Sequence, residues 1–418
     1  MSAKKKKLKT GNITLQNFST RAHYYILLLI LFLMPFYRQA IPPLIILLII
    51  FWFLQGNLKE NFYRPFKNRF TLLLLLFYFL HIVGLLYSTN QPAGRFDLEV
   101  KLSLLLFPFL MGGIVASCQK EQVNHFLWCF VISNIISSLI CFIAVIPKIP
   151  SEYYLYSEFT VFLHPSYGAM YVLFSISILV NFLMNGKIPE WKNVLSSQKM
   201  KWLMVGMILF LCGIVFLYSS RAGLLSGLAI ILVSLFVFFY KIKLNLFVKI
   251  TAITLSLFVL LFLVNQNRRF VLLTQFFQTN TSSQHTLNEN VSVRYQVVLE
   301  TLNLIKENFW KGVGTGDVKD VLMNRYHQAG IISAEVQNMN VHNQFLETTL
   351  GLGIVGGVLL LSLTLLPFIL GIKHRNLLLV FFSIIIIVNF MFESMLNTQN
   401  GVVFFSLFYS LLMTSEDN

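Results

Sequence analysis

The chain has 418 residues, of which 56% are hydrophobic and only 12% are charged, and 41 of them are phenylalanine. Typical globular chains are about 45–50% apolar and about 25% charged. A soluble core could not bury this much apolar surface, so the composition excludes a cytosolic enzyme, a disordered chain and a secreted disulfide scaffold. The formal net charge is +15, but the basic residues lie between apolar runs, so no nucleic-acid partner is expected.

The chain begins with a lysine-rich segment, residues 1–21, which precedes the first apolar run. No small-x-small cleavage site follows that run, and many further apolar runs come after it. We therefore interpret the first run as a retained membrane anchor and not as a signal peptide.

Twelve apolar segments are each long enough, or nearly so, to cross a bilayer as a helix. They cover about residues 22–37, 41–56, 70–88, 101–117, 124–147, 165–185, 201–219, 222–240, 247–265, 344–371, 376–392 and 400–414. The sequence thus predicts an all-α integral membrane protein with about twelve transmembrane helices. It contains no internal repeat, which argues against a transporter built from inverted repeats.

The distribution of basic residues predicts the orientation of these helices. With the N-terminus in the cytoplasm, the short inner loops hold twenty lysines and arginines, and the short outer loops hold five. The positive-inside rule therefore places both termini in the cytoplasm. The predicted organisation is a basic cytoplasmic segment (1–21), helices 1–9 (22–265), a periplasmic loop (266–343), helices 10–12 (344–414) and a cytoplasmic tail (415–418).

The long loop of about 266–343 carries two helical patterns. Val298, Leu302, Ile305 and Phe309 repeat at helical spacing, and a second pattern follows Asp317, a candidate N-cap. We expect two short helices packed on the outer face of the membrane domain.

Two arginines on the predicted outer side could bind phosphate. Arg221 lies in a turn of almost no length between two spans, and Arg294 lies at the start of the first loop helix. Guanidinium groups bind phosphate in a bidentate manner and can neutralise a pyrophosphate leaving group without a metal. The alternatives are a snorkelling arginine at position 221 and a solvated helix face at position 294.

A histidine and a carboxylate lie on the same predicted side. His342 stands where the long loop re-enters the membrane, and Glu393 ends the eleventh span. A histidine can take a proton from an attacking hydroxyl near neutral pH, and a carboxylate can orient it. The alternatives are a structural histidine and an exposed loop acid. Together with the arginines, these residues indicate group transfer from a lipid pyrophosphate at the outer membrane–water boundary.

Other motifs carry less chemistry. Gly312, Gly314 and Gly316 form a GxGxG pattern without a preceding strand, which favours a loop turn over a nucleotide site. No HExxH motif or pair of aspartates predicts a metal site. The four cysteines lack CxxC spacing and are predicted to be membrane-buried without disulfides or metal. They are Cys118, Cys129, Cys141 and Cys212.

The chain resembles the superfamily of O-antigen ligases and O-antigen polymerases, which are polytopic glycosyltransferases. The resemblance covers roughly residues 160–410 and includes the order of twelve spans and one long loop before the histidine. It rests on Ser220-Arg221-Ala222-Gly223, Val293-Arg294-Tyr295, the glycine pattern 312–316, and His342-Asn343 followed after nine residues by Gly353-x-x-Gly356.

This resemblance implies a metal-independent enzyme without a cofactor, acting as a monomer in a bacterial inner membrane with its active site facing the periplasm. It would move a glycan from undecaprenyl pyrophosphate to a hydroxyl of the lipid A–core. Arg221 and Arg294 would hold the pyrophosphate, and His342 would activate the acceptor hydroxyl or stabilise the transition state. Glu393 stands where ligases often carry an acidic residue.

Three further candidates complete the predicted site, His164, Asn343 and Tyr167. His164 and Tyr167 resemble a motif in some relatives, without an assigned role, and Asn343 is part of the histidine motif.

Four functions remain open on the sequence. Because a single long loop precedes the histidine motif and the other outer loops are short, we favour a ligase over a polymerase, which more often has two sizeable periplasmic loops. A transferase that glycosylates protein is a third alternative. A glycan-lipid transporter is the least favoured, because the mid-span positions are nearly all apolar.

Overall fold

The computed structural model describes residues 2–55, 58–117, 120–148, 159–185, 197–241, 251, 254 and 289–416. Throughout these residues the regular structure is helical. The helices are α1 (Ser2–Leu33), α2 (Ile41–Leu54), α3 (Leu58–Lys67), α4 (Arg69–Leu86), α5 (Gln91–Ser117), α6 (Lys120–Val145), α7 (Pro165–Asn185), α8 (Ser197–Tyr218), α9 (Arg221–Lys241), α12 (Glu289–Glu307), α13 (Val318–Gln328), α14 (Ile332–Val336), α15 (Gln344–Lys373), α16 (Leu377–Phe392) and α17 (Gln399–Glu416). Three short 3-10 turns, η1 (Arg38–Ala40), η2 (Ile146–Lys148) and η3 (Met395–Asn397), join some of them.

Six of the described helices are long and apolar enough to cross a membrane: α4, most of α6, α7, α8, α9 and α15. A seventh results if α2 and α3, which meet at 115°, form one broken span. The segments Phe18–Leu33 and Leu377–Phe392 are apolar but shorter. The described residues are thus helical and contain several candidate spans, as expected for a multi-pass membrane protein, whereas the number twelve and the orientation stay predictions. The span expected at 247–265 lies outside the described residues.

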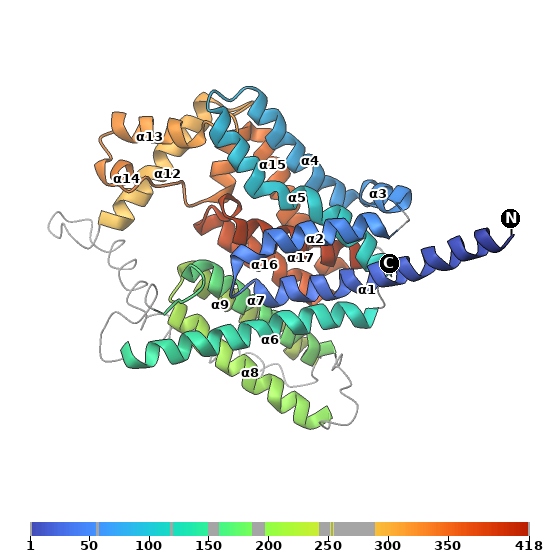
Figure 1. The fold of residues 1–418 in the computed structure, drawn as a ribbon. Coiled ribbons are helices and arrows are strands. Elements are labelled where there is room, and N and C mark those ends of the chain that lie inside the picture. Colours follow the sequence, from blue (N-terminus) through green and yellow to red (C-terminus); the bar gives the residue numbers. More distant parts are fainter. Residues whose placement is uncertain are drawn as a thin grey trace.

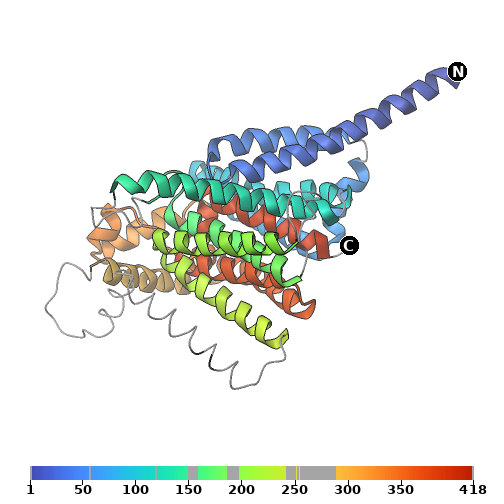
Figure 2. The same ribbon diagram turned by 90° about the horizontal axis from the view of Figure 1, so that it is seen from below.

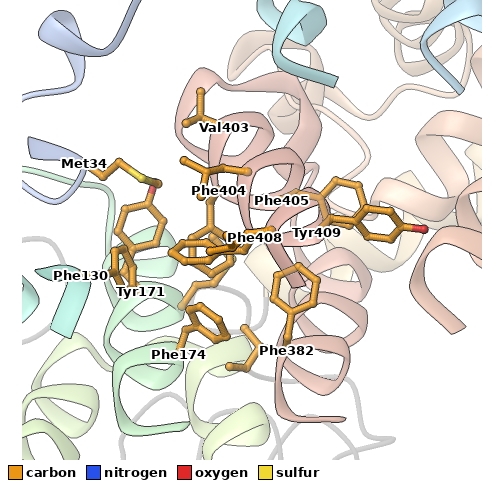
Figure 3. Packing of buried hydrophobic residues seen from close by; sticks show 14 of the residues in the cluster. Met34, Phe130, Tyr171, Phe174, Phe382, Val403, Phe404, Phe405, Phe408 and Tyr409 are labelled. Carbon is orange, nitrogen blue, oxygen red and sulfur yellow. The ribbon is translucent and has the colours of Figure 1, made fainter. Parts of the chain in front are cut away.

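Helix α7 is the centre of the membrane bundle. Of its apolar window 83% is buried inside the protein, against 22% for α9. Aromatic rings from α6 and α17 pack against those of α7 (Figure 3). The ring centroid of Phe174 in α7 lies 4.6 Å from that of Phe408 in α17, and Tyr171 in α7 is stacked on Phe404 in α17 at 5.0 Å between centroids. Such packing holds the first residues of α7 in a fixed position, and these residues contribute to the site below.

The helices α12, α13 and α14 lie at the end of the bundle opposite the two termini (Figures 1 and 2). They have an apolar core of their own, to which Val297, Leu322, Tyr326 and Ala334 contribute. The two helices expected in the long loop are therefore present as α12 and α13. The five-residue α14 was not anticipated, since one turn of helix leaves too short a pattern to detect.

The glycine motif after α12 is a close-packed turn, as the sequence indicates. The N–H groups of Val313 and Gly314 donate to the carbonyls of Leu350 and Gly351, each at 2.9 Å. These carbonyls are free to accept because α15 is broken at Gly353, whose backbone adopts φ 68° and ψ −170°. The motif predicted from His342-Asn343 and the glycines is therefore a helix cap followed by a helix break.

Asp317 occupies the N-cap position of α13, as expected, but its carboxylate does not cap that helix. It instead accepts hydrogen bonds from the backbone N–H groups of Thr89 and Asn90, both at 2.7 Å. The carboxylate therefore fixes the glycine turn to the loop between α4 and α5, a contact that local helix signals cannot reveal.

Candidate active site

His342 stands between α14 and α15 with its backbone in the left-handed region, φ 51°. Such a conformation is uncommon outside glycine and costs about 1 kcal/mol. It is held on one side by a hydrogen bond from the His342 N–H to Asn340 Oδ1 at 3.1 Å. On the other side, the side chain of Asn343 caps α15 by accepting from the N–H of Leu346 at 3.0 Å. Backbone strain of this kind is typical of functional sites.

Glu393 follows the last residue of α16 and brings its carboxylate to this histidine. Its Oε2 lies 3.2 Å from His342 Nδ1, and its Oε1 accepts a hydrogen bond from Ser166 Oγ at 3.0 Å. The side chains of His342 and Glu393 are 25% and 18% exposed. Both are thus shielded from bulk water while the histidine remains accessible to a substrate.

The surroundings keep the Glu393 carboxyl ionised. Burial raises its pKa, but the hydrogen bond and charge of His342, the charge of Arg294 and the hydrogen bond from Ser166 together outweigh it. The pKa of Glu393 therefore lies below its ordinary value of 4.5. Opposite charges and donors that favour the ionised form act in this direction.

An ionised carboxylate only accepts hydrogen bonds, so Nδ1 of His342 must be the donor in this pair. In the neutral imidazole the proton then resides on Nδ1, and Nε2 carries a lone pair. A histidine oriented in this way by a carboxylate can accept a proton from a hydroxyl group at Nε2.

Arg294 lies in the second turn of α12 and is half-buried. Its charge helps to lower the pKa of Glu393, so the guanidinium lies within electrostatic range of this carboxylate. The structure thus brings together one of the two predicted arginines, the histidine and the carboxylate.

Arg221 is the first residue of α9, after Ser219, whose backbone is also left-handed at φ 49°. Its height in the bundle follows from a contact between α9 and α16, where Asn389 Nδ2 donates to Ser226 Oγ at 3.5 Å. At 1.5 Å per residue, Arg221 begins α9 about 7.5 Å from Ser226, and Glu393 lies about 6 Å beyond Asn389. Because the two helices run antiparallel, Arg221 and Glu393 lie at the same end of the bundle.

The three further candidates have different surroundings. His164 is exposed just before α7, and its Nδ1 accepts from the N–H of Ser166 at 3.4 Å. Tyr167 is buried, and its hydroxyl accepts from Thr398 Oγ1 at 2.6 Å. Asn343 caps α15 and donates from Nδ2 to the carbonyl of Met391 at 3.3 Å. The contacts of Tyr167 and Asn343 are those of positioning residues.

Two polar residues of this region were not predicted. Ser166 orients Glu393 through its hydrogen bond. The only indication of this role in the sequence was the position of Ser166 between the candidates His164 and Tyr167. Glu347 is buried in the first turn of α15, where Ser394 and Asn397 donate hydrogen bonds to its carboxylate. An acidic residue inside an apolar run costs free energy in a membrane, and on this ground Glu347 could have been selected from the sequence as a candidate functional residue.

No group of three or more histidine, cysteine, aspartate or glutamate side chains able to hold a metal ion occurs within the described ranges. The charged groups at this end of the bundle are the His342–Glu393 pair, Arg294 and, at the start of α9, Arg221.

Comparison with known protein families finds one match, over part of the chain. Residues 205–361 match the O-antigen ligase family. The matched segment covers less than half of the chain and includes Arg221, Arg294, His342 and the glycine turn, whereas Ser166 and Glu393 lie outside it. The resemblance inferred from the motifs is confirmed for this segment. A search of curated proteins found no match.

Proposed function

We propose that this chain is an O-antigen ligase-type glycosyltransferase, which moves a glycan from undecaprenyl pyrophosphate to a hydroxyl of the lipid A–core on the periplasmic side of the inner membrane. The observation that carries the proposal is the 3.2 Å contact between His342 Nδ1 and Glu393 Oε2, within electrostatic range of Arg294. The family match over residues 205–361 supports the same reaction class.

In the proposed reaction, Nε2 of His342 takes the proton of the acceptor hydroxyl. The oxygen attacks the anomeric carbon of the donor sugar and forms the new glycosidic bond. The bond between that carbon and the pyrophosphate oxygen breaks, and undecaprenyl pyrophosphate leaves with the electron pair. Glu393 keeps the imidazole oriented and stabilises its positive charge after proton transfer.

The two arginines have the complementary role in this proposal. Guanidinium groups of Arg221 and Arg294 would hold the pyrophosphate and neutralise the charge that develops on the leaving oxygen. Arg221 is the first residue of α9, and Arg294 lies in the second turn of α12. This charge stabilisation needs no metal, so activity is expected to persist in a chelator.

Deletion of the gene, followed by analysis of lipopolysaccharide on a gel, tests the proposal. A ligase predicts bare core, with glycan polymer accumulating on the lipid carrier. Core that bears a single repeat unit would instead identify a polymerase, for which the family match is equally compatible. Unchanged lipopolysaccharide would contradict both and direct the search to another glycan or a protein acceptor.

Complementation then ties the function to the site. A plasmid copy carrying His342→Ala should insert into the membrane but fail to restore polymer on the core. A matched control is His327→Ala, because His327 also pairs with a glutamate, Glu335, at 3.1 Å but is exposed. Restoration by both variants would remove the histidine from the proposed mechanism.

A further inference from the structure

A polar cavity of about 280 Å³ lies beside the His342 segment, between α4, α5, α13 and α15. This volume is just below that of typical small-molecule sites, about 300–1,000 Å³, and suits a single sugar ring better than an oligosaccharide. None of these four helices carries Arg221 or Arg294. Neither arginine lines the cavity, so we treat it as separate from the proposed pyrophosphate site.

Four charged side chains line the cavity and balance one another. Asp97 and Lys101 form a salt bridge along α5, with Lys101 only 3% exposed, while Glu347 on α15 and Lys319 on α13 contribute one charge each. Burial lowers the pKa of Lys319, although the charge of Glu347 acts against this shift. Two acidic and two basic side chains line the cavity, so it has no excess of basic groups with which to bind a phosphate or another anion.

The cavity also offers the groups that recognise a sugar. Carboxylates and amides, here Glu347 and Asn340, can accept hydrogen bonds from ligand hydroxyls, and ammonium groups can donate to them. His81 donates from Nδ1 to the carbonyl of Phe77 at 2.9 Å, so its neutral ring presents Nε2 as a further acceptor. Phe96, also in the lining, is 66% exposed and provides an apolar face for the C–H groups of a pyranose ring.

Asn340 connects this cavity to the proposed catalytic histidine. It lines the cavity, and its Oδ1 accepts the hydrogen bond from the His342 N–H. Glu347 is joined to the same region because Ser394, the residue after Glu393, donates to its carboxylate. A ligand in the cavity therefore lies beside the backbone segment that carries His342, and neither Arg221 nor Arg294 lines the cavity.

We propose that this cavity binds a neutral sugar residue of the acceptor glycan, with Phe96 beneath the ring and Glu347 accepting from its hydroxyls. This inference rests on the proposed function, since it places the nucleophilic hydroxyl beside His342 and away from the leaving group. It adds a recognition site for the acceptor on α4, α5, α13 and α15.

Direct binding tests the cavity independently of any transfer reaction. The purified full-length protein in lipid nanodiscs is titrated with core oligosaccharide released from the lipid A–core, and binding is followed by saturation-transfer-difference NMR. Phe96→Ala and Glu347→Gln should each weaken binding by about tenfold. Phe79→Ala is the matched control, because Phe79 on α4 is also largely exposed but does not line the cavity.

A kinetic comparison distinguishes acceptor from donor. Phe96→Ala should raise the KM for acceptor about tenfold while leaving the KM for donor and kcat within about twofold. Phe96→Leu, which keeps the bulk without the ring, provides a second variant if the alanine variant folds poorly. A raised KM for donor alone, or binding unchanged in every cavity variant, would overturn the inference. Unchanged lipopolysaccharide after gene deletion would instead overturn the proposed function, while the binding experiment would still report on the cavity.

Discussion

The imidazole of His342 and the carboxylate of Glu393 meet at 3.2 Å although 51 residues separate them in the chain. His342 precedes the first turn of α15, and Glu393 follows the last turn of α16. Because these two helices pack against each other along the bundle, the start of one and the end of the other lie together. The pair is thus set by the antiparallel packing of two apolar helices and is fixed further by Ser166 at the start of the central helix α7.

Replacing Glu393 with glutamine tests the role of this pair. The amide cannot stabilise a charged imidazole, and its NH₂ group favours the wrong tautomer of His342. We expect kcat to fall about a hundredfold or more, with little change in the KM values. The measurement is initial-rate kinetics on purified protein with both substrates.

Glu335→Gln is the control for this substitution, since Glu335 pairs with the exposed His327 on α13. The control should retain wild-type kcat. Equal kcat in Glu393→Gln and the wild type would show that the carboxylate has no part in the reaction.

Acidification should destabilise the protein through the same carboxylate. The pKa of Glu393 is lowered in the folded state, so its ionised form contributes stability above the ordinary glutamate pKa of 4.5. This contribution is lost as the pH falls below that value. We expect the melting temperature of the wild type to fall more steeply than that of Glu393→Gln between about pH 5 and pH 3.5. Parallel curves in a thermal-unfolding series would contradict this linkage.

The sequence was sufficient to predict a helical membrane protein and to select candidate residues that lie near one another, for physical reasons. Long apolar runs leave helices as the solution for backbone groups in lipid. His342 and Glu393 are ionisable groups at the ends of such runs, and Arg294 lies in the long loop on the same predicted side. Their proximity was inferred from the side of the membrane on which each was expected, and the structure brings these three together.

Other features depend on tertiary contacts that no local pattern records. Asp317 has the sequence signature of a helix cap, yet its carboxylate binds backbone groups more than two hundred residues earlier. In the sequence Ser166 is an ordinary small residue of an apolar helix. Its role appears only from its hydrogen bond to Glu393 at the end of α16. The polar cavity likewise draws Phe96 and Glu347 from segments that the sequence could not pair.

Arg221→Lys and Arg294→Lys test whether pyrophosphate needs the guanidinium geometry. An ammonium keeps the charge but lacks the planar fork that contacts two oxygens at once. We expect each lysine variant to lower kcat/KM for donor about tenfold to a hundredfold. Arg325→Lys is the control, because Arg325 pairs with Glu307 at 2.5 Å and serves the contact between α13 and α12. Full activity in both test variants would leave a requirement for positive charge alone.

The last prediction concerns the glycine turn that joins α12 to the break in α15. Gly312 and Gly330 both have left-handed backbones, at φ 71° and φ 66°, so alanine at either position should cost about 1 kcal/mol in the free energy of unfolding. A Cβ atom at Gly330 would meet open space, whereas one at Gly312 would lie 2.5 Å from the carbonyl of Gly351. Backbone cannot move aside as a side chain can, so Gly312→Ala should cost about 3 kcal/mol or more. Thermal unfolding of the two variants in detergent measures the difference, and equal losses would show that the close approach of the turn to α15 does not contribute to stability.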